Sequence, residues 1–326
     1  MSFNEQYFDK ALAKLEERRA FNRMKEQARS AEINARLPEY AKLDELLATT
    51  SAKLIMIMLQ EKDKAAEKLS QLETGNLHIQ RNMEELLVNA GYPADYLDPI
   101  YTCPKCKDKG TLNGKWCECF QRIMLNIAAE ELNSFSPLEP STFDKFSLEY
   151  YSAEKDEKLG TSPRVIMQKN LEFCKSYAKE FSTHSNGILM TGGTGLGKTH
   201  LSLAIVNQIM ANGFNAIYGS APEMLRVIER EYYSKEKNEK DTMDALTQCD
   251  LLVLDDLGAE MDKQLYTSLL YELLNARLCR GLPTIVSSNL TPNELKQRYQ
   301  DRICSRLFGF ELLMFVGSDV RRKLTR

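Results

Sequence analysis

Long apolar runs and a strong excess of one charge are both missing from this sequence. The most apolar stretch, LIMIMLQ at residues 54–60, is too short to span a bilayer, and the first twenty residues lack the apolar core of a secretion signal. With 43 basic and 46 acidic residues the net charge is −3, so any surface for nucleic acid must be local. These absences predict a cytoplasmic protein with no membrane-bound part.

Cysteine is also sparse, yet half of it is concentrated in one short stretch. Eight cysteines in 326 residues are too few for a disulfide scaffold, and the cytosol keeps thiols reduced. Cys103 and Cys106 form C-x-x-C, and Cys117 and Cys119 form C-x-C after a predicted Asn-Gly turn. Two such turns can present four thiolates to one structural Zn²⁺ and leave no open coordination position. An iron–sulfur cluster stays an alternative. The other cysteines are predicted to be small buried residues: Cys174, Cys249, Cys279 and Cys304.

The pattern of apolar residues predicts a chain of several parts. Residues 1–100 show apolar positions at helical spacing, which predicts a helical hairpin, a short coiled coil or a partner-binding surface. Residues 101–125 form the four-cysteine module, and the proline-containing residues 126–139 are predicted to be a linker. From residue 140 to 326, short apolar runs alternate with amphipathic segments, which predicts an α/β domain with a parallel sheet covered on both faces.

The strongest motif in the chain is GGTGLGKT, which fits the phosphate-binding loop G-x-x-x-x-G-K-T. It follows an apolar strand and precedes an amphipathic helix, so its backbone N–H groups and the helix N-terminus would cradle phosphates. Lys198 would reach the β- and γ-phosphates of ATP, and the hydroxyl of Thr199 would bind Mg²⁺. The predicted nucleotide-binding residues of the loop are Gly192, Gly193, Thr194, Gly195, Leu196, Gly197, Lys198 and Thr199.

Polar residues at the ends of two later strands complete a predicted ATPase site. Asp255 and Asp256 end the apolar run LLVLDDLG. Asp255 fits the Mg²⁺-binding role, and Asp256 fits the position that orients or deprotonates the attacking water. Asn289 ends the run TIVSSN and would hold that water against the γ-phosphate, although a place near a helix N-cap is the alternative for this residue.

At this point the residues resemble a known family. The order of GGTGLGKT, LLVLDDLG, SSN, SRLFG and GSDVRR is similar to the ATPase domain of bacterial helicase loaders of the DnaC/DnaI type. These are AAA+ P-loop proteins, with transposition helper ATPases of the IstB type as close relatives. The resemblance covers about residues 140–326, and GYPADYLDPIYTCPKCKDKG resembles the N-terminal half of DnaI-like members. It implies that STFDKF, with Phe143 and Phe146, lies near the adenine.

The resemblance also assigns two arginines. Arg306 in SRLFG matches the arginine finger that acts on a neighbouring subunit's nucleotide, with Arg302 as the alternative. Arg321 in GSDVR matches the second sensor arginine, with Arg322 as the alternative. The chain ends soon afterwards, so no C-terminal helical lid is expected. Many AAA+ enzymes have glutamate where this chain has Asp256, so slow turnover is expected.

The function that the resemblance implies is an ATP-dependent loader. It would bind the replicative hexameric helicase and deliver it to single-stranded DNA, with ATP, Mg²⁺ and structural Zn²⁺ as its cofactors. The chain's own binding to single-stranded DNA is expected to be weak, and self-association is expected in the ATP state or on the helicase. Two alternatives stay open: a transposition helper of the IstB type, and a nucleotide-switch adaptor that barely hydrolyses ATP.

Overall fold

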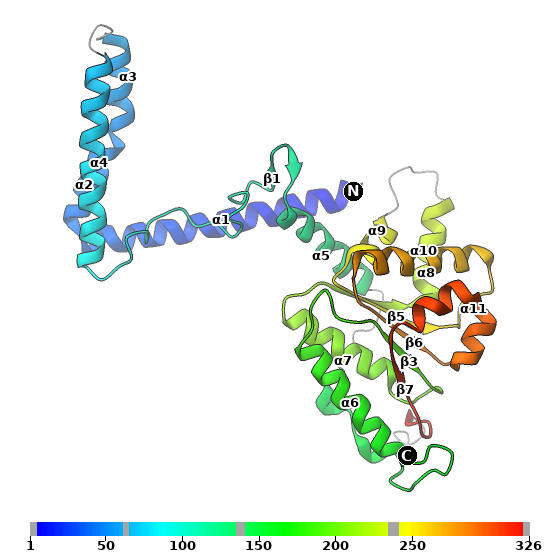
Figure 1. Cartoon of the computed structure of the whole chain (residues 1–326). Helices are drawn as coiled ribbons and strands as arrows, with labels where there is room; N and C mark the ends of the chain where they lie inside the picture. The colour runs from blue at the N-terminus through cyan, green and yellow to red at the C-terminus, as the bar shows by residue number, and fades with distance from the viewer. Residues whose placement is uncertain (1–4, 61–64, 135–140, 234–240, 322–326) are drawn as a thin grey trace. The chain divides into compact units, whose positions relative to one another are not determined.

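The structure, a computed structural model, describes residues 5–60, 65–134, 141–233 and 241–321. It contains two compact units, one formed by Leu12–Phe120 and the other by Met1–Ala11 with Gln121–Arg326 (Figure 1). The domain boundaries given above stay predictions. Residues 135–139 of the predicted linker lie outside the described residues, and residues 126–134 of it are helical.

The first unit is mainly helical, as predicted. Its helices are α1 (Glu5–Arg36, whose first turns belong to the other unit), α2 (Pro38–Ala48), α3 (Thr50–Gln60) and α4 (Ala65–Asn89). A small apolar core forms where α1, α2 and α4 meet, and its buried members are Ile33, Tyr40, Met83 and Leu87. A core this small leaves many apolar side chains of these helices exposed, among them Ile55, Met56 and Leu77.

The four-cysteine segment forms a miniature hairpin in the same unit. Strands β1 (Thr111–Leu112) and β2 (Lys115–Trp116) pair antiparallel. Asn113 and Gly114 link them with φ values of 52° and 75°. Two consecutive residues with positive φ are typical of a type I′ turn, which Asn-Gly favours because both residues tolerate this conformation. The predicted Asn-Gly turn is confirmed, and α5 (Glu118–Ser134) begins directly after the hairpin.

The second unit is built on a five-stranded parallel sheet. The strands are β3 (Ile188–Thr191), β4 (Ala216–Ser220), β5 (Leu251–Leu257), β6 (Thr284–Ser288) and β7 (Glu311–Met314). They lie in the order β4-β5-β6-β3-β7, and every neighbouring pair is parallel. The four strands from β3 to β6 are almost entirely buried, as expected for a parallel sheet with helices on both faces. The predicted α/β fold, a parallel sheet with helices on both faces, is confirmed.

Two helical layers cover the two faces of this sheet. Successive residues of a strand point to opposite faces, so they contact different layers. Ile188 and Met190 pack with one layer, whereas Leu189 packs with the other. The first layer contains α6 (Pro163–Lys179) and α7 (Lys198–Ala211). The second contains α8 (Ala221–Tyr233), α9 (Asp241–Gln248), α10 (Gln264–Arg280) and α11 (Pro292–Leu307). The carboxyl ends of the strands are left for the loops that carry the motifs.

The outer edge of β4 is covered by the end of α5. The side-chain amide of Asn133 donates to the carbonyl of Ala216 and accepts from the amide of Tyr218, each at 2.9 Å. This pairing satisfies backbone groups that an edge strand would otherwise expose.

Three of the four scattered cysteines are buried, as predicted, but Cys279 is exposed, so that prediction was wrong for this residue. Cys279 follows Leu278 on the outer side of α10, where Leu278 is also exposed. Among the described residues, none of the helices combines the length and the apolar character needed to cross a bilayer.

Candidate functional site

The phosphate-binding loop joins β3 to α7 through left-handed turns that suit glycine. Gly195 and Gly197 have φ values of 71° and 88°, and Gly197 is the residue directly before α7. A Cβ on Gly195 would collide with the carboxylate of Asp319, in the segment that follows β7. The amide of Val320 in that segment donates to the carbonyl of Gly195 at 2.9 Å. The loop therefore needs glycine both for its backbone conformation and for this close approach.

Lys198, the first residue of α7, is almost completely buried at the loop. Its Nζ donates to the carbonyls of Gly192 and Gly193 at 2.7 and 2.8 Å and to Oδ1 of Asn289 at 2.7 Å. Burial lowers the pKa of Lys198, and the carboxylates of Asp256 and Asp255 oppose this shift. The ammonium group is thus held between the loop and the end of β6, in a position to bind a phosphate.

Asp255 lies at the centre of a buried network of hydroxyl groups. Its Oδ2 accepts from Thr199 Oγ1 at 2.9 Å and from the Tyr218 hydroxyl at 2.6 Å, and its Oδ1 accepts from Ser287 Oγ. Burial, and then the charge of Asp255, raise the pKa of Tyr218 above its usual range, so Tyr218 stays a donor. Thr199 and Asp255, the pair predicted to hold Mg²⁺, are therefore in direct contact.

Asp256 turns out of the line of β5. Its φ is 55°, and the register of β5 on β6 shifts between Leu254 and Leu257. A left-handed aspartate in a strand is strained and is often found at functional sites. The amide of Asp256 donates to Ser287 Oγ at 3.1 Å, and its Oδ1 accepts from Asn289 Nδ2 at 3.1 Å. Asn289 thus contacts both Lys198 and Asp256.

A pocket of about 550 Å³ lies beside these groups. Its size is typical of a small-molecule site. Residues 194–199 of the loop line it together with Asp256, Asn289 and Arg321. Phe146, Tyr150 and Tyr151 form an aromatic side of the pocket, and the rings of Phe146 and Tyr151 stack with centroids 5.8 Å apart. Phe146 lines this pocket, whereas Phe143 is not among the lining residues in the described part of the chain, and the position of the adenine stays a prediction.

The two arginines of the resemblance lie in different places. Arg321 lines the pocket, whereas Arg306 packs on α10. The guanidinium of Arg306 lies 4.4 Å from the centroid of the Tyr271 ring and donates to Asn275 Oδ1 at 2.6 Å. Arg302, the alternative finger, is exposed, and Arg322, the alternative sensor, lies outside the described residues.

Sequence reasoning missed Tyr218, Ser287 and the aromatic residues Tyr150 and Tyr151. The first two contact Asp255 and carry a signal that was available. Each carries a hydroxyl group and lies in a strand that pairs with the strand of Asp255.

The four cysteines of the hairpin converge as a tetrahedral metal site requires. Their Sγ atoms all lie within 4.8 Å of one another, with Cys103 to Cys117 at 3.9 Å and Cys106 to Cys119 at 3.4 Å. Four sulfurs about 2.3 Å from one Zn²⁺ would be about 3.8 Å apart. A hydrogen bond from the backbone of Cys106 lowers the pKa of the Cys103 thiol to about 7, whereas burial raises the pKa of the Cys119 thiol. The cluster is therefore compatible with zinc.

Asp108 supports the turn that carries the first cysteine pair. Its Oδ1 accepts from the amide of Cys103 at 2.9 Å, and its Oδ2 accepts from the amide of Thr102 and from Asn22 Nδ2. Arg19 Nε donates to the carbonyl of Asp108 at 2.8 Å. A buried carboxylate with three side-chain hydrogen bonds thus fixes the turn and ties it to α1.

We expect Asp108→Asn to weaken zinc retention about 10- to 100-fold, as changes behind metal ligands usually do. The asparagine NH₂ group would face N–H donors, so at least one hydrogen bond is lost. A competition titration with a chromogenic chelator measures the effect, with Asp95→Asn at an exposed turn position as the control. Equal zinc affinity in both variants would show that Asp108 does not support the metal turn.

The sequence is similar to a family of ATP binding proteins and to two replicative helicase loaders. Residues 166–307 match the family of IstB-like ATP binding proteins. The replicative helicase loader DnaI of Bacillus subtilis is 30% identical over 136 residues, which are 41% of this chain and 42% of that protein. The replicative helicase loader DnaC of Escherichia coli is 21% identical over 137 residues, which are 42% of this chain and 56% of that protein.

A crystal structure of the DnaC helicase loader aligns with a TM-score of 0.47 at 18% identity, over 56% of this chain and 99% of that one. The chain thus spans roughly half of the length of the two curated relatives. The predicted resemblance to the DnaC/DnaI and IstB proteins is confirmed, and residues 166–307 are similar to IstB-like ATP binding proteins. The roles of the individual site residues stay predictions.

Proposed function

We propose that this chain, with its similarity to IstB-like ATP binding proteins and to replicative helicase loaders, hydrolyses ATP to deliver a replicative helicase onto single-stranded DNA. One observation carries the catalytic part of the proposal. Lys198, Asp256 and Asn289 converge, by direct hydrogen bonds, at one end of the sheet beside a pocket large enough for a nucleotide.

Each group at this site has a role that follows from its chemistry. The loop amides and Lys198 bind the β- and γ-phosphates and neutralise their charge. Thr199 and Asp255 would hold Mg²⁺, which supplies further neutralisation of the triphosphate. Asp256 orients the attacking water and accepts its proton, while Asn289 holds the water in line with the γ-phosphate. Arg321 stabilises the negative charge that develops on the transferred phosphate.

Arg306 fits a role on a neighbouring copy's nucleotide. It is not among the residues that line its own chain's pocket, and it lies near the end of α11. An arginine supplied in trans typically raises phosphoryl-transfer rates by orders of magnitude. Self-association, in solution with ATP or on the helicase, follows from this role.

The helical unit fits the part of partner binding. Ile55 and Met56 on α3 and Leu77 on α4 have exposed fractions of 59%, 56% and 49%. These exposed apolar side chains lie on two helices that pack against each other, and exposed apolar surface is typical of protein-binding sites. The hexameric helicase is the partner that the similarity to DnaI and DnaC suggests.

We expect Asp256→Asn to lower kcat for ATP about a hundredfold and to leave KM nearly unchanged, because the variant lacks the base but keeps the phosphate contacts. Burial, and then the charge of Asp255, raise the pKa of Asp256 above the 3.8 of an ordinary aspartate. A base must be ionised, so activity falls as the pH drops through this raised pKa. The acidic limb of the kcat/KM profile, which reports the nucleotide-free protein, should therefore lie above pH 3.8 in the native chain and be absent in Asp256→Asn. A variant with native kcat would remove Asp256 from the mechanism.

The loader activity is tested by co-elution and transfer. Purified protein is mixed with the host's replicative helicase and ATP, and helicase placed on circular single-stranded DNA is measured by its unwinding of an annealed strand. A stable complex and ATP-dependent transfer support the proposal. Absence of a complex under every nucleotide condition contradicts it.

A second candidate function is helper ATPase to a transposase, which the family match over residues 166–307 favours. The helical and cysteine-bearing unit before that segment argues for the loader, because the resemblance to the helper proteins covers mainly the ATPase domain. A nucleotide switch would instead bind ATP with an intact pocket and show no turnover above the Lys198→Ala background.

A further inference from the structure

Glu260 is a buried carboxylate that the ATPase chemistry does not use. Only 3% of its side chain is exposed, and it lies in the loop between β5 and α10, four residues after Asp256. Burying a carboxylate is costly unless it is paired and hydrogen-bonded. The groups that pair with Glu260 therefore identify the element to which this loop is attached.

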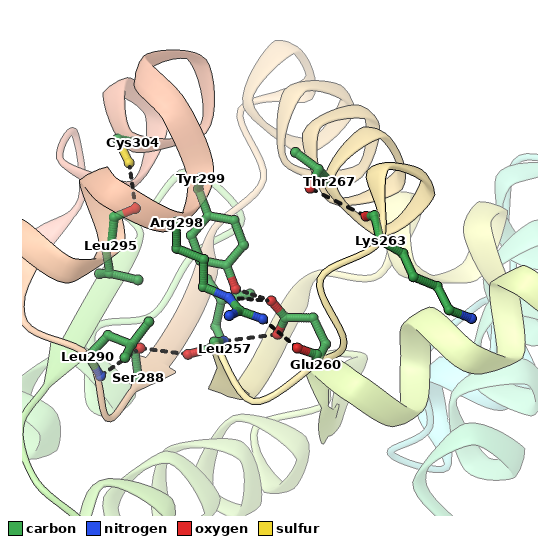
Figure 2. A network of polar contacts seen from close by, with 11 residues as sticks. Leu257, Glu260, Lys263, Thr267, Ser288, Leu290, Leu295, Arg298, Tyr299 and Cys304 are labelled. Carbon is green, nitrogen blue, oxygen red and sulfur yellow. Dashed lines mark hydrogen bonds and ion pairs between the residues drawn. The ribbon is translucent and has the colours of Figure 1, made fainter.

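Most of the donors to Glu260 come from α11 (Figure 2). Arg298 Nε donates to Oε1 at 3.3 Å, and its Nη2 donates to the Glu260 carbonyl. The hydroxyl of Tyr299 donates to the same Oε1. Oε2 accepts from the amide of Gly258 at 2.9 Å, which closes the loop on itself. Both carboxylate oxygens are thus bound, and two adjacent residues of α11 hold the loop.

A second contact joins the same loop to the segment before α11. Ser288 Oγ donates to the carbonyl of Leu257 at 2.6 Å and accepts from the amide of Leu290 at 3.1 Å. Gly258 has a φ of 104°, and a Cβ there would lie 2.6 Å from Leu290 Cδ1. A side chain at position 258 would therefore be strained by the backbone conformation and would force the Leu290 side chain to shift.

These contacts connect the two nucleotide-facing residues with the arginine predicted to act in trans. The loop of Glu260 follows Asp256, and α11 follows Asn289 after a capping box formed by Thr291 and Glu294. The last turn of α11 carries Arg306. A well-capped helix moves as a rigid element, so a shift of its first half displaces its last turn as well.

We propose that Glu260 is a positioning residue that couples Asp256 and Asn289 to Arg306. The nucleotide bound by one copy then sets how that copy presents its arginine to the next. The proposal rests on the proposed function, because it assigns Arg306 to a neighbouring site. It goes further by naming the residue through which one site influences the next, which gives the pair of sites a coupling free energy.

Hydrogen exchange on the full chain tests the coupling without requiring hydrolysis. Wild type is compared with and without a non-hydrolysable ATP analogue and Mg²⁺, in peptides covering residues 192–199 and residues 292–307. We expect the analogue to slow exchange in both segments, by about fivefold or more in α11. In Glu260→Gln the slowing should persist at residues 192–199 and disappear in α11.

Glu229→Gln is the matched control. Glu229 on α8 is another carboxylate that accepts from a cation and a tyrosine, namely Lys263 Nζ at 2.8 Å and the Tyr266 hydroxyl at 2.6 Å, but neither partner lies on α11. It should behave as wild type. Tyr299→Phe keeps the buried ring and removes one donor to Glu260. It should lose the slowing of exchange in α11 as Glu260→Gln does, and it replaces Glu260→Gln in the test if Glu260→Gln fails to fold.

A kinetic cycle distinguishes positioning from general destabilisation. If Glu260 acts through Arg306, adding Glu260→Gln to Arg306→Ala should cause no further loss of kcat, whereas independent effects would multiply. The possible failures are also distinct. No slowing at residues 192–199 in wild type would contradict nucleotide binding and hence the proposed function. Slowing at residues 192–199 without any change in α11 would overturn the coupling alone. The same holds if the α11 response survives in both Glu260→Gln and Tyr299→Phe.

Discussion

Lys198→Ala is expected to abolish ATP-dependent transfer of helicase and to lower ATP turnover about a thousandfold, the scale of losing a charged group aimed at the transition state. Lys198 is the cation that contacts the phosphate-binding loop and Asn289 together. Its removal takes one positive charge away from the β- and γ-phosphates, and it leaves the Gly192 and Gly193 carbonyls without the ammonium group that donates to them. Affinity for ATP should fall as well, because this interaction exists in the ground state.

The measurement is steady-state phosphate release, with nucleotide affinity from a fluorescent ATP analogue. Lys175→Ala is the control, because Lys175 is an exposed lysine on α6 in the same unit and is not among the residues that line the pocket. It should retain native kcat and KM. Thermal unfolding establishes that both variants are folded. Native turnover in Lys198→Ala would contradict the assignment of the pocket as an ATPase site.

The contrast between what sequence could and could not predict has a physical origin. The phosphate-binding loop was predictable because its eight residues are contiguous and three of its four glycines have a positive φ that favours glycine. Asp255 and Asn289 were predictable because parallel strands bring their carboxyl ends to one edge of the sheet. The fold class followed from the alternation of apolar strands with longer amphipathic segments.

The groups that support the site were not predictable in the same way. Tyr218 and Ser287 donate hydrogen bonds directly to Asp255, although they are 37 and 32 positions away in the sequence. Only the order of the strands in the sheet brings them next to it. Glu260 depends on Arg298 and Tyr299 in another element. Cys279 was predicted wrongly for a related reason. Its amino-acid type alone suggested burial, but its position on α10 leaves it exposed. Side-chain partners depend on tertiary packing, which a local motif does not encode.

Removal of the metal should have the largest effect on stability. We expect the purified chain to carry about one zinc ion per molecule, and Cys106→Ser to lose it together with the structure of residues 101–120. Few apolar side chains hold this segment together, since its strands are two residues long and exposed. Structural zinc in such small modules typically contributes about 10 kcal/mol or more to folding, which two short strands cannot replace.

Metal content is measured by mass spectrometry, and the order of residues 101–120 by hydrogen exchange before and after chelation. Cys279→Ser is the matched control, because it also replaces a thiol with a hydroxyl but at an exposed position on α10. It should keep full zinc content and native exchange. In Cys106→Ser the backbone amides of the turn that Asp108 joins to Asn22 and Arg19 should exchange rapidly. The metal no longer holds the backbone of this turn in place. Iron and sulfide in place of zinc would overturn the zinc assignment, and a metal-free chain with slow exchange at residues 101–120 would overturn the structural role of any metal.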